Sequence, residues 1–172
     1  ELAILRSLLT EIEFDKYKEL GRIAAEAMVS TLREIRQGST ETEAAARLVY
    51  EGHKRGCLVP VALIASDERT EKYRHPLPVE KPLLYSGESK RINNIVMVVG
   101  CFLKEGLVVS LTRFKQVGKV SDEIKDAYKR ICGVDALVQE ATVPGKTLGD
   151  VFEKYIEAYR VMGFPENEWH NH

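Results

Sequence analysis

The sequence predicts an α+β domain in which an antiparallel hairpin is covered by helices, and in which the helical part occurs twice. Residues 95–103 form a continuous apolar run rich in β-branched residues, which is typical of a buried strand. Residues 107–114 return as a second strand after a turn at Gly106. Helical signals on either side of the hairpin recur at one constant interval. Because both strands are apolar, we expect the hairpin to lie at the centre of its sheet.

Two helices are predicted before the hairpin. Capping boxes begin at Thr10 and Thr40, each with Glu three positions later. Apolar residues follow each box at helical spacing, and Gly38 and Gly56 end the two segments. These signals predict one helix over residues 11–36 and a second that ends near Gly56.

A strand and a long connection are predicted between these helices and the hairpin. Residues 58–65 are apolar, and Pro60 limits this strand to an edge of the sheet because proline cannot donate a ladder hydrogen bond. Residues 66–94 are polar and contain several prolines, a length that favours a functional connection. Within it, we expect Asp67, Glu68 and Arg69 to form a solvated loop.

Two further helices are predicted after the hairpin, capped at Ser121 and Thr147 and separated by Pro144 and Gly145. When the sequence is shifted by one constant number of residues, the N-cap residues and terminating glycines of the first helix pair superpose on those of the second, for instance Thr40 on Thr147. This register predicts a duplicated αβ half. The first copy spans residues 1–118, and the second spans residues 119–172.

The second copy is expected to be truncated. At the same shift, His172 superposes on Ala65, so the chain reaches only the start of the second copy's first strand. The second hairpin falls outside the sequence. We therefore expect either a longer protein or a second copy of the chain, in a homodimer, to cover the open side of the sheet.

The composition excludes several classes of partner. The net charge of −1 gives no basic footprint for nucleic acid, and no apolar stretch approaches membrane-spanning length. The three cysteines, Cys57, Cys101 and Cys132, lie in or beside apolar segments without a C-x-x-C spacing. We expect buried thiols in a reducing compartment, and therefore a cytoplasmic protein with neither nucleic-acid nor membrane partners.

The order of these features resembles the pita-bread family, which includes methionine aminopeptidase, the Xaa-Pro peptidases (prolidase and aminopeptidase P) and creatinase. The resemblance is carried by residues 21–27, by residues 38–41 and by short motifs: Arg55-Gly56, Arg74-His75-Pro76, Leu111-Thr112-Arg113 and Pro144-Gly145. It implies two αβ halves related by a pseudo-twofold axis, with helices outside a curved antiparallel sheet. It also implies hydrolysis of a small peptide or amide substrate.

The metal ligands of that family are not matched in the hairpin. The family's metallopeptidases carry one aspartate in each hairpin strand, eleven residues apart, with the later one two residues before the threonine. Counting back from Thr112 gives Ser110 and Val99. Valine has no ligand atom, and a neutral hydroxyl is a poor ligand for a hard divalent cation. We therefore expect neither manganese, cobalt nor zinc as a cofactor.

The resemblance implies five candidate site residues. His75 matches the histidine taken as the acid/base in creatinase, which works without metal; the alternative is a loop histidine with no role in catalysis. Arg74 and Arg113 are candidates for substrate binding, although Arg113 has the alternative role of fixing a buried carboxylate. His170 and His172, near the end of the sequence, are further substrate-binding candidates.

Two functions follow as hypotheses. The first is a Xaa-Pro peptidase-like or creatinase-like hydrolase domain that lacks the dinuclear metal centre and uses His75 on a C–N bond. The second is a non-catalytic homologue of the aminopeptidase family that binds peptides or serves as a scaffold. The sequence following His172 would discriminate between them, since paired glutamates there favour chemistry.

Overall fold

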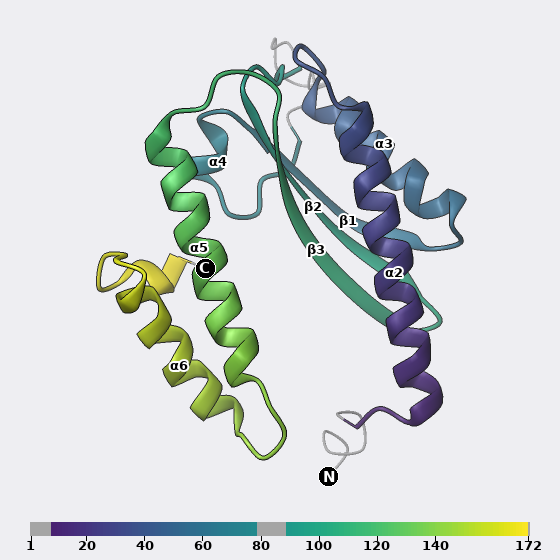
Figure 1. Ribbon diagram of the computed structural model, residues 1–172. Helices are drawn as coiled ribbons and strands as arrows, with labels where there is room; N and C mark the ends of the chain where they lie inside the picture. Colours follow the sequence, from purple (N-terminus) through teal and green to yellow (C-terminus); the bar gives the residue numbers. More distant parts are fainter. Residues whose placement is uncertain (1–7, 79–88, 172) are drawn as a thin grey trace. The chain divides into compact units, whose positions relative to one another are not determined.

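The hairpin predicted from the sequence forms two strands of a three-stranded antiparallel sheet in the order β1-β2-β3 (Figure 1). The computed structural model describes residues 8–78 and 89–171. The strands are β1, Leu58–Ser66; β2, Ile95–Lys104; and β3, Leu107–Gln116. Within the described residues the chain divides into two compact units between Lys119 and Val120. The sheet belongs to the first unit.

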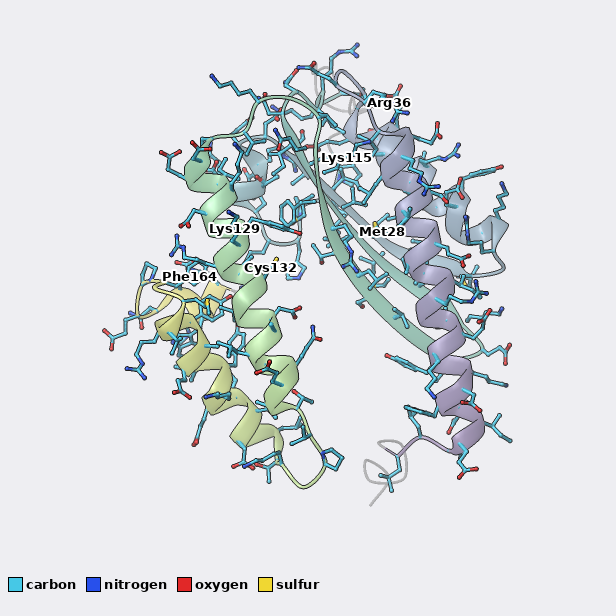
Figure 2. The ribbon with its side chains drawn as sticks, viewed as in Figure 1. Met28, Arg36, Lys115, Lys129, Cys132 and Phe164 are labelled. Carbon is cyan, nitrogen blue, oxygen red and sulfur yellow. The ribbon has the colours of Figure 1, made fainter. Side chains whose placement is uncertain are left out.

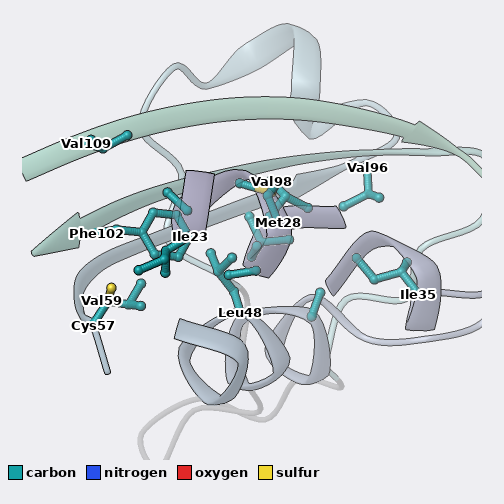
Figure 3. Packing of buried hydrophobic residues seen from close by; sticks show 14 of the residues in the cluster. Ile23, Met28, Ile35, Leu48, Cys57, Val59, Val96, Val98, Phe102 and Val109 are labelled. Carbon is teal, nitrogen blue, oxygen red and sulfur yellow. The ribbon is translucent and has the colours of Figure 1, made fainter. Parts of the chain in front are cut away.

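Helices α2 (Glu11–Glu34) and α3 (Glu41–Lys54) cover one face of the sheet. Alternate side chains of β2 are buried against them, among them Val98 and Phe102, each with 0% of its surface exposed. Figure 3 shows Leu48 of α3 and Met28 of α2 packed beneath these strand residues. Burial of one such large apolar side chain stabilises the fold by about 1.5–3 kcal/mol.

Both helices begin and end close to the predicted positions. Thr10 and Thr40 each form a complete capping box, with their side chains accepting from the backbone N–H of the glutamate three residues later. Gly38 and Gly56 adopt φ values of 89° and 77°, a left-handed conformation that glycine adopts without a Cβ clash. The predicted first helix is two residues longer than the observed one.

The prediction that the hairpin lies at the centre of the sheet is correct for β2 and wrong for β3. β2 pairs on both sides, whereas β3 is an edge strand within the described part of the chain. Half of the residues of β3, including Val108 and Ser110, are exposed. β1 is the other edge strand, as Pro60 predicts, and its register shifts between Leu58 and Val61.

The connection after β1 is more structured than the sequence predicts. It begins with a short helix, α4, over Arg69–Lys72. Asp67 has a φ of 51°, and its carboxylate accepts hydrogen bonds from the backbone N–H groups of Asn93, Asn94 and Ile95 at 3.0, 2.7 and 3.2 Å. The prediction of a solvated loop is therefore wrong for Asp67, which caps the start of β2, and for Arg69, which lies in α4, whereas Glu68 is exposed as expected.

The second unit consists of α5 (Asp122–Ala141), α6 (Leu148–Val161) and the 3-10 helix η1 (Glu168–Asn171). Val134, Ala158 and Tyr159 form its buried core. The prediction that the chain enters a strand near its end is wrong for the described residues. The segment coils into η1, where the Trp169 ring packs edge-on against Phe152 at a centroid distance of 5.6 Å.

The two helix pairs match at the single offset that the sequence predicts. Adding 107 to the bounds of α3, 41 and 54, gives 148 and 161, the bounds of α6. Adding 107 to 34, the last residue of α2, gives 141, the last residue of α5. Gly145 and Gly163 have φ values of 90° and 73°, close to those of their counterparts. The periodicity in the sequence therefore corresponds to equivalent local geometry.

Two expectations from composition bear on the fold. In the described ranges, no helix is both long and apolar enough to cross a membrane. All three cysteines are free: Cys57 is buried and Cys101 half-buried, but Cys132 is exposed on α5. The prediction of a buried thiol is thus wrong for Cys132, because α5 contributes a different stripe, including Val134, to the core of its unit.

Candidate functional site

The candidate site is the face of the hairpin opposite to α2 and α3, which we call the distal face. Val98 and Phe102 point to the helices, so Val99 and Cys101, which alternate with them, point to the distal face. In the register of the hairpin, Val99 lies opposite Thr112 and Cys101 lies opposite Ser110. Cross-strand partners share a face, so Val99 and Ser110 are diagonal neighbours on the distal face.

This pair occupies the two positions that the resemblance assigns to metal-binding aspartates. The Ser110 hydroxyl lies 3.2 Å from the Cys101 thiol, and Val99 offers only methyl groups. Hard divalent cations require several oxygen ligands, chiefly carboxylates. Within the described ranges, no cluster of three or more His, Cys, Asp or Glu side chains is placed to hold a metal ion. The residues on this face therefore do not fit a dinuclear metal centre.

His75 lies on an exposed segment that runs along the outer edge of β1. The backbone N–H of Ile64 on β1 donates to the carbonyl of Pro76 at 3.1 Å, which fixes this segment against the strand. His75 and Arg74 are both exposed. Neighbouring strands lie about 4.8 Å apart, and β1 and β2 separate this segment from β3, so the backbones of Pro76 and Ser110 are at least about 14 Å apart across the sheet. His75 and Ser110 therefore do not form a nucleophile–base pair.

Arg113 lies on the other side of the sheet. It pairs in register with Val98, whose side chain faces α2 and α3. Its exposed guanidinium donates to the carbonyl of Thr112 at 2.7 Å, and within the described residues no carboxylate pairs with it. Arg113 is thus separated from Val99 and Ser110 by the sheet itself.

Lys115 follows Arg113 on the same face and contacts the end of α2. Its ammonium donates to the carbonyls of Leu32 and Ile35, and Figure 2 labels it together with Arg36 of the same region. Desolvation, together with the nearby Arg36 charge, lowers the pKa of Lys115. This cation satisfies carbonyls at the C-terminus of α2, where helix dipoles favour positive charge.

His170 belongs to the second unit, and His172 lies outside the described residues. The His170 ring stacks on Trp169 with a centroid distance of 3.6 Å. Together with Phe152, Tyr155 and Leu148, these residues line a shallow groove of about 450 Å³. His170 is therefore part of an aromatic surface on α6 and η1, in place of the strand position expected for it.

Sequence reasoning missed the residues that hold the His75 segment. Glu41 is fully buried, accepts from the backbone N–H and the hydroxyl of Ser66 at 2.8 Å each, and forms an ion pair with Arg69. In the sequence, Glu41 is one of two acidic residues in the first turn of α3, and nothing distinguishes it from a solvated helix-start glutamate. Only the fold brings Ser66 and Arg69 onto it.

Comparison with solved structures identifies the fold. The chain is similar to the X-Pro aminopeptidase from Thermotoga maritima, with a TM-score of 0.80 and 23% identity over 94% of this chain and 44% of that one. The prolidase from Pyrococcus furiosus gives 0.78 and 23% over 92% and 45%, and a dipeptidase from Mycobacterium ulcerans gives 0.81 and 19% over 94% and 42%. The chain thus spans less than half the length of these proteins, and the predicted pita-bread fold is confirmed.

Comparison with the curated proteins gave no significant match. The model of metallopeptidase family M24, in contrast, matches residues 15–171, which is nearly the whole sequence. The match covers both helix pairs and the hairpin that carries Val99 and Ser110. The chain therefore belongs to metallopeptidase family M24.

Proposed function

We propose that this chain is a hydrolase domain of the Xaa-Pro peptidase and creatinase type, which cleaves a C–N bond in a small peptide or amide without a dinuclear metal centre. The observation that carries the proposal is the distal face of the hairpin, where Val99 and Ser110 stand at the positions that the resemblance assigns to carboxylates. The exposed His75 stands at the position that the resemblance assigns to a histidine. The names of the similar structures, which include X-Pro aminopeptidase, prolidase and Xaa-Pro dipeptidase, support the substrate class. A cytoplasmic location is part of the proposal.

His75 supplies the proton transfers in this proposal. Imidazole exchanges protons readily near neutral pH and is the commonest general acid and base in enzymes. His75 accepts a proton from the attacking water as its oxygen bonds to the amide carbon. It then donates that proton to the leaving nitrogen as the C–N bond breaks. Arg74, the neighbouring exposed cation, is placed to attract the carboxylate of a small peptide.

The test is hydrolysis of Xaa-Pro dipeptides and small amides by the purified protein, with and without a chelator. We expect chelator-insensitive hydrolysis that falls at least about 100-fold in His75→Ala, since general acid–base catalysis contributes about 10²–10⁴-fold. The melting temperature should stay nearly unchanged, because His75 is exposed. His53→Ala, at the end of α3, is the matched control and should keep the wild-type rate. An unchanged rate in His75→Ala, or loss of activity with chelator, contradicts the proposal.

A second candidate function is a non-catalytic peptide-binding module. The separation of His75 from the hairpin hydroxyl and thiol, across β1 and β2, favours it, because no described nucleophile of the hairpin lies within reach of the imidazole. Saturable binding of Xaa-Pro peptides in calorimetry, without turnover, would establish this function. Turnover of any of these peptides would exclude it.

A further inference from the structure

We propose that the buried ion pair of Glu41 and Arg69 positions His75 for its role. Arg69 lies at the start of α4, six residues before His75, and Glu41 lies at the start of α3. The pair is almost completely removed from solvent: the Glu41 side chain is 0% exposed and that of Arg69 is 15% exposed. The catalytic meaning of this inference rests on the proposed function of His75, whereas the positioning itself does not.

Arg69 holds the His75 segment from both sides. On the N-terminal side, its backbone carbonyl accepts from the N–H of Tyr73 at 3.2 Å, and its guanidinium lies over the Tyr73 ring at 5.4 Å. On the C-terminal side, its Nη2 donates to the carbonyl of Leu77 at 3.0 Å. Both ends of the segment from Tyr73 to Leu77 therefore contact the Arg69 side chain, and His75 is the middle residue of this segment.

Glu41 fixes the position of Arg69. One carboxylate oxygen accepts from both the N–H and the hydroxyl of Ser66, the last residue of β1, and the other accepts from Nη1 of Arg69. The guanidinium is a planar fork, so Nη1 on Glu41 and Nη2 on Leu77 define its orientation. The segment is thus connected to α3 and to β1 through one rigid group. The bond from Ile64 to Pro76 adds a second attachment to β1.

The chain contains a matched control on the same helix. Glu51, near the end of α3, is also buried and forms ion pairs with Arg47 and Arg55. Arg55 also donates to the Ser30 hydroxyl at 2.8 Å, on α2. This second buried network joins α2 to α3, and its residues all lie on these two helices or at the C-terminal end of α3. Arg55→Lys therefore perturbs a comparable ion pair at a distance from the His75 segment.

The experiment follows the imidazole signals of the protein by ¹H–¹³C NMR. The four histidines of the sequence make the assignment direct, with His75→Ala identifying the His75 signal. Arg69→Lys keeps the positive charge that pairs with Glu41 but replaces the planar guanidinium with a single ammonium group. We expect Arg69→Lys and Glu41→Gln to move and sharpen the His75 signal, with those of His53 and His170 unchanged. Arg55→Lys should leave the His75 signal in place. An unmoved His75 signal in both folded variants would overturn the positioning.

A measurement on the wild-type protein covers the case in which these variants do not fold. Amide hydrogen exchange should be slow at Ile64, whose N–H is bonded to Pro76 outside the sheet. Exchange at Ile64 as fast as at an exposed amide would also overturn the inference. In an active protein, Arg69→Lys should lower kcat about 10-fold or more with a smaller change in KM. A moved His75 signal with an unchanged kcat supports the positioning and contradicts the catalytic role of His75.

Discussion

Thr40 and Thr147 occupy equivalent positions in the two helix pairs and make the same two hydrogen bonds at the first turns of α3 and α6. The N–H of Thr40 donates to Glu43 at 2.7 Å, and that of Thr147 donates to Asp150 at 2.8 Å. In return, each hydroxyl accepts from the N–H of that acidic residue at 3.1 Å. The same capping arrangement thus occurs in both helix pairs, which supports the predicted duplication of the αβ half.

Removing either cap should destabilise the protein by a similar amount. We expect Thr40→Ala and Thr147→Ala each to lower the free energy of unfolding by about 1 kcal/mol, because each leaves a first-turn N–H without its side-chain acceptor. Urea denaturation followed by circular dichroism measures this. Glu153→Ala, on the exposed side of α6, is the control and should change stability by less than about 0.5 kcal/mol. A Thr147→Ala variant as stable as this control would contradict the prediction.

The helices could be predicted from the sequence because their signals are local. Capping boxes, helical spacing and glycines such as Gly38 and Gly56 depend on residues within a few positions of one another. The edge position of β1 followed from Pro60 in the same way. The exposure of β3 could not be predicted in this way, because whether a strand is paired on one side or on both depends on which other strands lie beside it.

The surroundings of the candidate site depend on contacts between distant residues. Arg69 is 28 residues from Glu41, and Asp67 is 28 residues from Ile95, so no local pattern reveals either contact. The positions of Val99 and Ser110 on one face could be predicted, since strand alternation and the hairpin turn fix them. The resemblance makes Arg113 a candidate for binding substrate or for fixing a buried carboxylate, and strand alternation places it on the face of the sheet that α2 and α3 cover.

The carboxylate of Asp67 should make the stability of the first unit sensitive to acid. Burial acts to raise the pKa of Asp67, but hydrogen bonds from the N–H groups of Asn94, Asn93 and Ile95 outweigh it and hold the pKa below its ordinary value. A carboxyl group whose pKa is lower in the folded state stabilises the protein fully above its unfolded pKa of about 3.9. That contribution is lost as the pH falls through the lower folded pKa.

Asp67→Asn is the variant that tests this expectation. Asparagine tolerates the φ of 51° at this position but cannot carry the charge, so the substitution separates electrostatics from backbone strain. At pH 7 we expect it to lower the free energy of unfolding by about 1–3 kcal/mol. As the pH falls from about 5 to about 2, the difference in the free energy of unfolding between the variant and the wild-type protein should shrink, because Asp67 becomes protonated. Urea denaturation across this range measures it, and a difference independent of pH would contradict the assignment.

The hairpin should not support a dinuclear metal centre. Val99 and Ser110 remove the bridging carboxylates that hold two cations close together. We expect protein purified without chelator, and then titrated with manganese or cobalt, to hold fewer than two tightly bound equivalents per chain, as measured by elemental analysis and calorimetry. The double variant Val99→Asp/Ser110→Asp restores two carboxylates to one face and should bind manganese more tightly than wild type. Two tight equivalents in the wild-type protein would contradict this prediction.

The outer edge of β3 is the basis for expecting a homodimer. The carbonyls of Val108 and Thr112 accept from the side chains of Tyr17 and Arg113, both at 2.7 Å, so these residues direct their backbone groups away from β2. Within the described residues, no strand pairs with this edge. An open edge favours pairing with another chain, and we expect light scattering to give about twice the chain mass of 19.4 kDa.

Thr112→Pro tests whether this edge makes the dimer. Proline removes an N–H that points away from β2 and is tolerated on the outer side of an edge strand, so the sheet itself should persist. We expect the variant to be a monomer with a wild-type circular dichroism spectrum. Val108→Thr, which changes an exposed side chain on the same edge and keeps every backbone donor, is the control and should remain a dimer. A monomeric wild-type protein at micromolar concentration would contradict the expectation, and a dimeric Thr112→Pro variant would exclude β3 as the contact.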